Sequence, residues 1–181
     1  MPHLKLVNIN DLQLFRDLYQ TPECMKHICA CLTETEVKQT LDSCIKFNSR
    51  RDPLHSYYKI ELEHENFSAG LVSLHKKNAR EFGQVVEIGI ILQPELHGSG
   101  IGIQLIASLC MKLISDWNQP KILLKCRETN TRLGSIMSRL GFSLSKSDGM
   151  QFWLMVGSPA KVAILNAAGY TSLDIQLQED L

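Results

Sequence analysis

The hydrophobic period of the chain changes along its length. Over about 9–51, apolar residues recur at helical spacing, and Asn10–Asp11, Thr21–Pro22 and Thr33–Glu36 each offer a helix start. Leu4–Val7 read as a short strand before these helices. From Tyr58 to Glu63 apolar and polar residues alternate, which predicts a half-buried strand. A turn at Glu63–Asn66 and a partner strand at Ala69–His75 complete an antiparallel pair.

The second half of the chain alternates strands with helices. A polar loop is expected at Lys76–Phe82, before a nearly unbroken apolar strand at Val85–Leu92 that is typical of a strand covered on both faces. The pattern then predicts a helix after Gly98–Gly102, a strand at Lys121–Cys126, a helix at Asn130–Leu140, a hairpin at Phe142–Val156 and a short helix from Ser158. This order indicates an α/β fold with a mixed sheet.

The composition limits the classes of partner that the protein is expected to bind. Lys plus Arg and Asp plus Glu each number 19 in 181 residues, so no surplus of cations supports nucleic-acid binding, although a local basic patch stays open. We find neither a secretion signal nor an apolar stretch of the ~20 residues that span a bilayer. We therefore expect a cytoplasmic protein without a membrane partner, whose six cysteines are free thiols.

The strongest chemical signal is the passage from the apolar strand through three glycines into a helix. Gly98, Gly100 and Gly102 can expose backbone N–H groups, and the helix start adds a positive dipole, which together suit a phosphate. No Gly-Lys-Ser/Thr follows as in a Walker loop, and Ile103 stands where a dinucleotide fingerprint needs glycine. Glycines that merely allow a tight turn are an equally open interpretation.

Two linked motifs resemble the GNAT superfamily of acetyl-CoA-dependent N-acetyltransferases. His97–Gly102 resembles its Gln/Arg-x-x-Gly-x-Gly/Ala loop, and Asn130–Phe142 resembles its Asn, helix, Gly-Phe motif. Glu87–Pro94 looks most like the branch that acetylates ribosomal-protein amino termini or polyamines. The resemblance covers Tyr58–Val156 well, and the first third of the chain only in its layout.

The resemblance implies a GNAT-type α/β fold, with a mixed sheet that changes from antiparallel to parallel in its centre and is flanked by helices. It implies a single domain over 1–181. Within it we expect a cofactor core at about 56–156, acceptor-side helices at about 9–51, and a C-terminal helix and tail at 158–181. The implied reaction moves an acetyl group directly from acetyl-CoA, as co-substrate and without a metal, to a primary amine. The acceptor is a protein amino terminus, a polyamine or another small amine.

The resemblance also assigns roles to residues. The loop would hold the pyrophosphate, the strand before it would pair with the pantetheine arm, and Asn130 would lie on the cofactor side. A backbone N–H of that strand, taken as that of Leu92, would stabilise the oxyanion. The implied cofactor-binding residues are Ile90, Ile91, Leu92, His97, Gly98, Ser99, Gly100, Ile101, Gly102 and Asn130.

Glu87 is the candidate base. It is the only ionisable residue in the apolar strand, so burial is expected to raise its pKa toward neutrality, and it matches the Glu of the branch. A carboxylate that faces solvent or pairs with a cation is the alternative.

Several positions depart from the family pattern. Met137 and Leu133 stand where relatives carry Tyr and Ser, so the usual acid is missing, and Ser135, Ser138 and Cys126 are nearby substitutes, of which we retain Ser138. His97 and Ser99 weaken the electrostatic hold on phosphate, for which Arg132, Lys76 or Lys77 would compensate. A non-catalytic acyl-CoA-binding sensor or scaffold is therefore the alternative function.

Two further clusters have a functional and a structural interpretation. Cys24, His27, Cys29 and Cys31 suggest zinc, but three of them fit one helical face and the spacing matches no usual zinc pattern, so we favour packing and no metal. Glu34, Glu36 and Asp42 are either an acidic wall that attracts a polyamine or a solvated helix face. The sequence leaves a monomer and a homodimer open.

Overall fold

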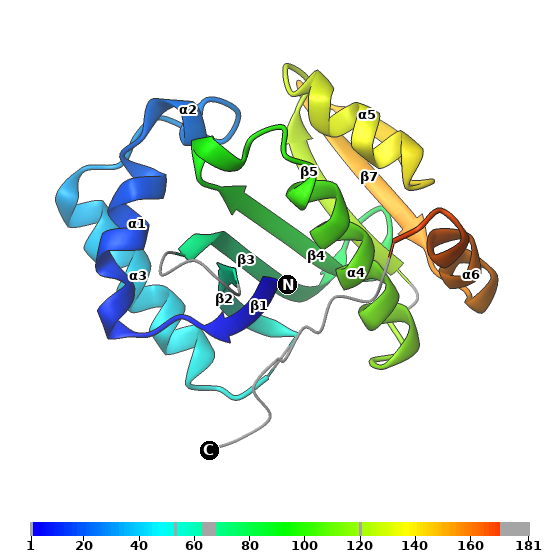
Figure 1. Cartoon of the computed structure of the whole chain (residues 1–181), viewed down its shortest axis with the longest axis horizontal. Helices are drawn as coiled ribbons and strands as arrows, with labels where there is room; N and C mark the ends of the chain where they lie inside the picture. The colour runs from blue at the N-terminus through cyan, green and yellow to red at the C-terminus, as the bar shows by residue number, and fades with distance from the viewer. Residues whose placement is uncertain (1, 53, 63–67, 120, 171–181) are drawn as a thin grey trace.

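A computed structural model describes residues 2–52, 54–62, 68–119 and 121–170. They form one seven-stranded sheet in the order β1-β2-β3-β4-β5-β7-β6, with helices on both faces (Figure 1). The strands are β1 (Pro2–Leu6), β2 (His55–Leu62), β3 (Ser68–Ala79), β4 (Gly83–Leu92), β5 (Lys121–Arg127), β6 (Ser143–Ser147) and β7 (Met150–Val156). The helices are α1 (Leu12–Tyr19), α2 (Pro22–Met25), α3 (Glu34–Asn48), α4 (Ile101–Ser115), α5 (Thr131–Arg139) and α6 (Pro159–Ala167). This confirms the predicted mixed α/β fold.

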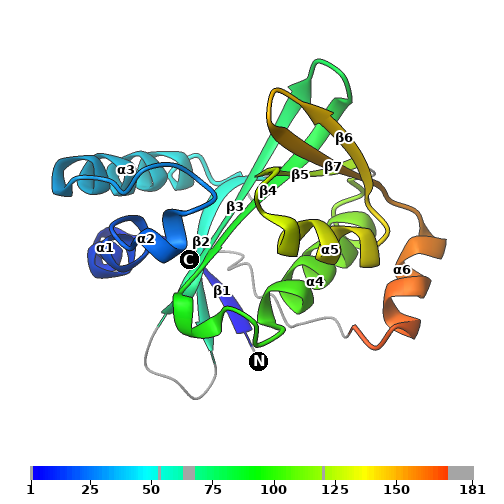
Figure 2. The ribbon, with the colours of Figure 1, turned by 90° about the horizontal axis from the view of Figure 1, so that it is seen from above.

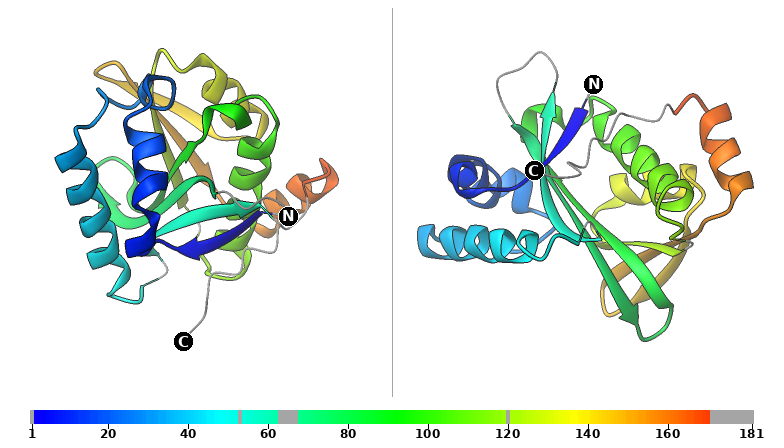
Figure 3. Two further views of the ribbon diagram at one scale, coloured as in Figure 1. Left: turned by 60° about the vertical axis from the view of Figure 1, so that its left-hand side comes forward. Right: turned by 90° about the horizontal axis from the view of Figure 1, so that it is seen from below.

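The sheet separates two apolar cores. The helices α1, α2 and α3 lie on one side of it and α4, α5 and α6 on the other (Figure 2), and α1 and α3 lie side by side (Figure 3). The larger core joins α4 to the sheet through residues such as Leu105, Leu109, Val86 and Ile88. The smaller core joins α1 and α3 to Leu71 of β3 and Ile91 of β4. The strand β4 is therefore covered on both faces, as its apolar run predicts.

The predicted helix starts are present, with one shift. Thr33 and Glu36 form a capping box at the start of α3. At α1 the capping box lies earlier than expected, because Asn8 and Asp11 cap a short 3-10 turn (Ile9–Asp11) that precedes the helix. Asp11 is buried, and its Oδ1 accepts a hydrogen bond from Lys59 Nζ at 2.8 Å. This contact ties the turn to β2.

The predicted polar loop at Lys76–Phe82 is wrong over its first half. β3 continues to Ala79, and Lys76 pairs with Val86 while Ala79 pairs with Gly83 in a long antiparallel ribbon with β4. Polar side chains are tolerated there because the ribbon extends past the helices that bury the rest of the strand. The predicted turn at Glu63–Asn66 and nearly all of the expected tail lie outside the described residues.

The closing elements follow from their glycines. Gly141 has φ 77° after α5, and Asp148 (φ 51°) with Gly149 (φ 72°) gives two consecutive positive φ angles between β6 and β7. Two positive angles define the type I′ turn that matches the twist of a tight hairpin. The hairpin was predicted at the correct place.

One buried side chain joins the helical layer to the sheet. Asn48, the last residue of α3, donates through Nδ2 to the carbonyls of Val7 (3.1 Å) and Tyr57 (2.9 Å). Its Oδ1 accepts a hydrogen bond from the Tyr57 N–H at 2.8 Å. A single amide thereby satisfies three backbone groups at a buried position, where no solvent replaces it.

We predict that Asn48→Ala lowers the free energy of unfolding by about 3 kcal/mol, because it leaves the Val7 carbonyl and the Tyr57 N–H without the partner that Asn48 provides. Urea denaturation measures the change, and Gln39→Ala on the exposed side of the same helix is the matched control. Equal stability of the two variants would show that these hydrogen bonds contribute little.

Candidate functional site

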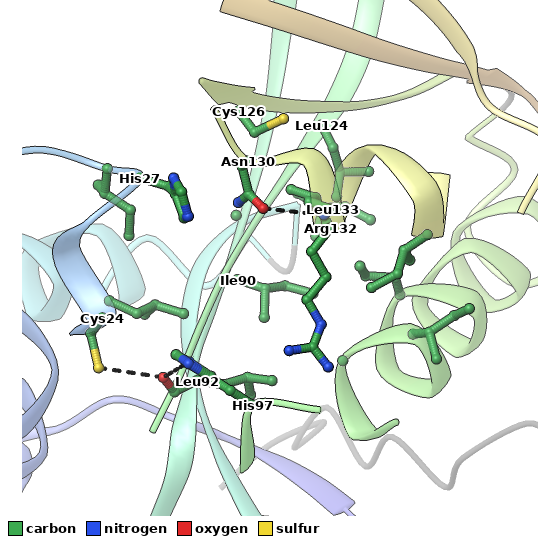
Figure 4. A pocket seen from close by; sticks show the side chains of 18 of the residues that line it. Cys24, His27, Ile90, Leu92, His97, Leu124, Cys126, Asn130, Arg132 and Leu133 are labelled. Carbon is green, nitrogen blue, oxygen red and sulfur yellow. Dashed lines mark hydrogen bonds between the residues drawn. The ribbon is translucent and has the colours of Figure 1, made fainter. Parts of the chain in front are cut away.

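A cavity of ≈ 840 Å³ lies where the sheet divides. It is lined from both sides of the sheet, by residues of α1 and α2, by β3 and β4, by the glycine loop, and by β5 and α5 (Figure 4). Its size is that of a small-molecule site. Of the predicted cofactor residues, Ile90, Ile91, Leu92, His97, Gly98, Gly100, Gly102 and Asn130 line it.

The cavity exists because β4 and β5 pair over a very short distance. They are parallel, and the register joins only Val86 to Ile122 and Glu87 to Leu123. Beyond Glu87 the two strands separate, while β4 stays paired with β3 as far as Leu92. The backbone of β4 past this point therefore has a partner on one side only.

The direction of the backbone groups of β4 follows from its ladder with β3. The Gln93 N–H donates to the Ala69 carbonyl at 2.9 Å, and hydrogen-bonded pairs alternate along an antiparallel ladder. Ile91 thus bonds to β3, whereas the N–H and C=O groups of Ile90 and Leu92 point away from β3. The Leu92 carbonyl accordingly accepts from Cys24 Sγ (3.5 Å) and His97 Nε2 (3.1 Å), which both lie outside β3.

The glycine loop has the geometry of an anion cradle. Gly98 (φ 95°) and Gly100 (φ 90°) adopt left-handed angles that L side chains rarely tolerate. Gly100 is the N-cap of α4, so the free N–H groups of the first helical turn and the helix dipole meet at the loop. Nothing lies within 4 Å of where a Cβ of Gly100 would be, so the space beside the loop is open.

The two polar side chains of the loop are used within it. His97 bonds to the Leu92 carbonyl, and Ser99 Oγ donates to the Leu96 carbonyl at 2.8 Å while accepting from the Ile101 N–H at 3.3 Å. These contacts fix the end of β4 and the start of α4. The N–H groups of His97, Ser99 and Ile101 also donate within this segment, so those of the three glycines, Gly98, Gly100 and Gly102, remain for a ligand.

The start of α5 forms the opposite wall. Asn130 caps this helix, since its Oδ1 accepts from the Leu133 N–H at 3.1 Å, and its Nδ2 remains a donor. Asn130, Arg132 and Leu133 all line the cavity. Met137, at the position of the usual Tyr, is instead fully buried in the larger core.

Glu87 is not the lone ionisable group that its strand suggests. Lys77 of β3 donates to its carboxylate, and Lys125 Nζ of β5 lies 3.4 Å from the same oxygen. Glu87 is therefore paired with cations from two neighbouring strands, and burial is not the only influence on its carboxylate. Sequence reasoning missed both partners because each comes from a neighbouring strand, and Lys77 falls in the segment predicted as loop.

The substitutes for the missing acid lie in different places. Ser135 and Cys126 line the cavity, whereas Ser138 is exposed on α5 and is not part of the described lining. Cys126 Sγ donates to Gln151 Oε1 at 3.5 Å, and burial raises the pKa of its thiol. Cys126 therefore keeps its proton at neutral pH.

The cavity wall on the side of α1 and α2 could not be predicted from the sequence. Tyr19, Glu23, His27, Tyr57 and Ser73 line it, and they come from α1, α2 and its following turn, β2 and β3. His27 Nδ1 lies 3.2 Å from Thr129 Oγ1, a contact that joins the turn after α2 to the loop between β5 and α5. No local sequence pattern predicts this set of residues, because they come together only in the folded protein.

The packing expected of the cysteine cluster is right for Cys24, which is buried, and wrong for Cys29 and Cys31, which are exposed. α2 ends at Met25, so Cys24, His27 and Cys31 do not share the predicted helical face. Among the described residues no three His, Cys, Asp or Glu side chains are placed to hold a metal. Glu34 bonds to Arg16 and Lys38 at the surface, and neither Glu34, Glu36 nor Asp42 belongs to the described cavity lining.

In the part of the chain that the structure describes, no helix is both long and apolar enough to cross a membrane.

Known proteins share this architecture. The profile of the acetyltransferase (GNAT) domain family matches residues 3–143. A comparison with curated proteins finds no significant match. Solved structures match at low identity, which shows the shared fold. A GNAT-family acetyltransferase from Bacillus anthracis is 14% identical with a TM-score of 0.69, over 84% of this chain and 93% of its own.

Two other solved structures have stated acceptors. Spermidine N-acetyltransferase from Vibrio cholerae, in complex with CoA and spermine, is 18% identical with a TM-score of 0.67, over 90% of this chain and 98% of its own. An acetyltransferase from Salmonella typhimurium that modifies the amino-terminal serine of a ribosomal subunit protein is 16% identical with a TM-score of 0.67, over 86% and 94%. Because the family profile matches most of the chain and the divided sheet is present, the protein belongs to the GNAT acetyltransferase family.

Proposed function

We propose that this GNAT acetyltransferase uses acetyl-CoA to acetylate a primary amine by direct transfer. The observation that carries the proposal is the shared cavity. The glycine loop and the outward-facing backbone groups of Ile90 and Leu92 line the same space, and this space also reaches the side of the sheet that α1 and α2 cover. A donor and an acceptor bound from opposite sides would therefore meet at the division of the sheet.

The residues of the cavity fit acetyl-CoA. Within the loop His97–Gly102, the glycines offer N–H groups to the pyrophosphate, and the start of α4 adds a helix dipole. Ile90–Leu92 offer an unpaired strand edge to the amide-containing arm, and Asn130 adds an amide donor from α5. Acetyl-CoA would supply an acyl thioester at this edge.

The backbone of β4 would stabilise charge in the reaction. When an amine attacks the thioester carbon, the carbonyl oxygen becomes negative, and a fixed N–H donor in a cavity stabilises that charge. The N–H groups of Leu92 and Ile90 both point away from β3, so either satisfies the directional requirement. The C–S bond then breaks and the acetyl group stays on the nitrogen.

Glu87 would receive the proton of the amine through water. Its side chain shares a face of β4 with Gly89, which lines the cavity, and its partner Lys125 also lines it. Because Glu87 itself is not among the described lining residues, we propose that a water carries the proton to it.

Departure of the thiolate would need little help. Met137 offers no proton at the usual place, but a thiol with an intrinsic pKa of ~8.5 leaves as the anion at a modest cost in rate. Ser135 and Cys126 are the donors at hand in the cavity, and Ser138 would have to act through solvent.

The buried Met137 also favours a second candidate function, a non-catalytic acyl-CoA sensor or scaffold. Free-thiol release during incubation with acetyl-CoA and a panel of amines separates the two. The panel should hold small monoamines, and also polyamines and peptides with free amino termini, because two similar solved structures are described as acting on spermidine and on a protein amino terminus. Sustained amine-dependent release rules out the sensor, and tight binding without release rules out the enzyme.

We predict that Gly100→Glu abolishes acetyl-CoA binding while the fold survives. The new side chain meets open space, but it carries a negative charge into the cradle and replaces a glycine at φ 90°. Calorimetric titration measures the affinity, and circular dichroism checks the fold. Unchanged affinity would remove the loop from the binding site.

We predict that Glu87→Gln lowers turnover by about 10²-fold or more while acetyl-CoA affinity changes little, because the amide no longer accepts a proton. Steady-state kinetics measure turnover and calorimetry measures affinity. Glu61→Gln is the matched control, since Glu61 also lies on a strand and pairs with two lysines, Lys5 (2.6 Å) and Lys59 (3.3 Å). Full activity in Glu87→Gln would exclude Glu87 as the base.

A further inference from the structure

The glycine loop lacks a cation of its own. His97 is bonded to the Leu92 carbonyl, and Ser99 is bonded within the loop, so neither side chain brings positive charge to the cradle. A helix start contributes roughly half an elementary charge. A pyrophosphate diester carries two negative charges, so loop and helix leave part of that charge without compensation.

One guanidinium lies against the loop from across the cavity. Arg132, in the first turn of α5, extends toward the loop (Figure 4), and a Cβ placed on Gly98 would come within 2.7 Å of its Nη2. The absence of a Cβ at Gly98 leaves room for this approach. Within the described residues Arg132 makes no hydrogen bond or ion pair, although its side chain lines the cavity. A cation without a partner among the described residues thus lies beside N–H groups that also have none.

The other cations near the cavity are either paired or lie away from the glycine loop. Lys77 and Lys125 are paired with Glu87. Lys76 lies outside the described lining. Arg139 lines the cavity at the end of α5, about 10 Å along the helix axis from Arg132. Arg132 is therefore the cation that the geometry assigns to the loop.

We propose that Arg132 is a phosphate-binding residue of this site and grips the pyrophosphate of the coenzyme from the α5 side. The inference rests on the proposed function and deepens it. The planar guanidinium donates two parallel hydrogen bonds to phosphate oxygens, while the N–H groups of the loop bind the same group from the β4 side. The ligand then bridges the two halves of the sheet that separate beyond Glu87.

The first experiment titrates acetyl-CoA into the wild type and variants by calorimetry. Arg132→Ala is expected to raise the dissociation constant about 10- to 100-fold, the range for a hydrogen-bonded charged pair. The dissociation constant of Arg132→Lys should lie between those of the wild type and Arg132→Ala, because lysine keeps the positive charge and loses the planar pair of donors. The control Arg127→Ala removes the same charge from an exposed residue outside the described lining and should stay within about twofold.

Folding and kinetics give independent readouts. Because Arg132 has no partner among the described residues, Arg132→Ala should unfold at the wild-type temperature without ligand and gain less stability from acetyl-CoA. In an active enzyme the KM for acetyl-CoA should rise while kcat changes little, as expected for lost ground-state binding. Wild-type affinity in Arg132→Ala would overturn the proposal and leave the acetyltransferase assignment standing.

Two further probes separate the possible phosphates and the possible failures. With dephospho-CoA, which lacks the 3′-phosphate, Arg132→Ala should lose affinity by the same factor, and a vanished effect would overturn the pyrophosphate assignment. Titration with inorganic pyrophosphate measures whether Arg132 binds the phosphates without the rest of the coenzyme. If the wild type binds pyrophosphate through Arg132 but not acetyl-CoA, the proposed function fails with the coenzyme part of the inference, and only the phosphate-binding role of Arg132 survives. If it binds neither, both are overturned.

Discussion

The short parallel contact between β4 and β5 is the constraint on which the rest of the site depends. Two residue pairs hold the strands together, and the sheet opens beyond them. A longer ladder would bond the N–H groups of Ile90 and Leu92 to β5 and leave no edge for a ligand. The opening tolerates unpaired backbone because it lines a cavity that admits solvent or substrate. Packing on both faces keeps the halves in place where the ladder ends.

The chemistry of the loop is divided between backbone and distant side chains. Glycines at 98 and 100 supply the left-handed turns, and the residues between and before them fasten the loop to β4 and α4. Charge complementarity then has to come from elsewhere, and Arg132 is the residue in reach. The same division applies at Glu87, whose lysine partners lie on β3 and β5. In both places a residue's neighbours in space decide its role more than its neighbours in sequence.

What the sequence could predict has a physical pattern. The helix caps at Thr33 and Ser158, the turn at Asp148–Gly149 and the glycine loop were readable because each depends on residues a few positions apart. The strand at Lys76–Ala79 was missed, since polar residues in an exposed ribbon carry no periodic signal. The prediction that Cys24, His27 and Cys31 share a helical face was wrong because the helix ends at Met25. The cavity wall that contains Tyr19, Tyr57 and Ser73 could not be predicted, because its residues come from separate elements that only the folded sheet brings together.

The connectivity of the divided sheet also bears on how the chain folds. β2, β3 and β4 follow one another as antiparallel neighbours, and so do β6 and β7, so these pairings close short loops. β5 meets β4 only through a connection that contains α4. Contacts of low sequence separation form fastest, and the amino-terminal part of a chain leaves the ribosome first. We expect the meander of β2–β4 to be organised during synthesis, and the place where the substrates would meet to be completed last.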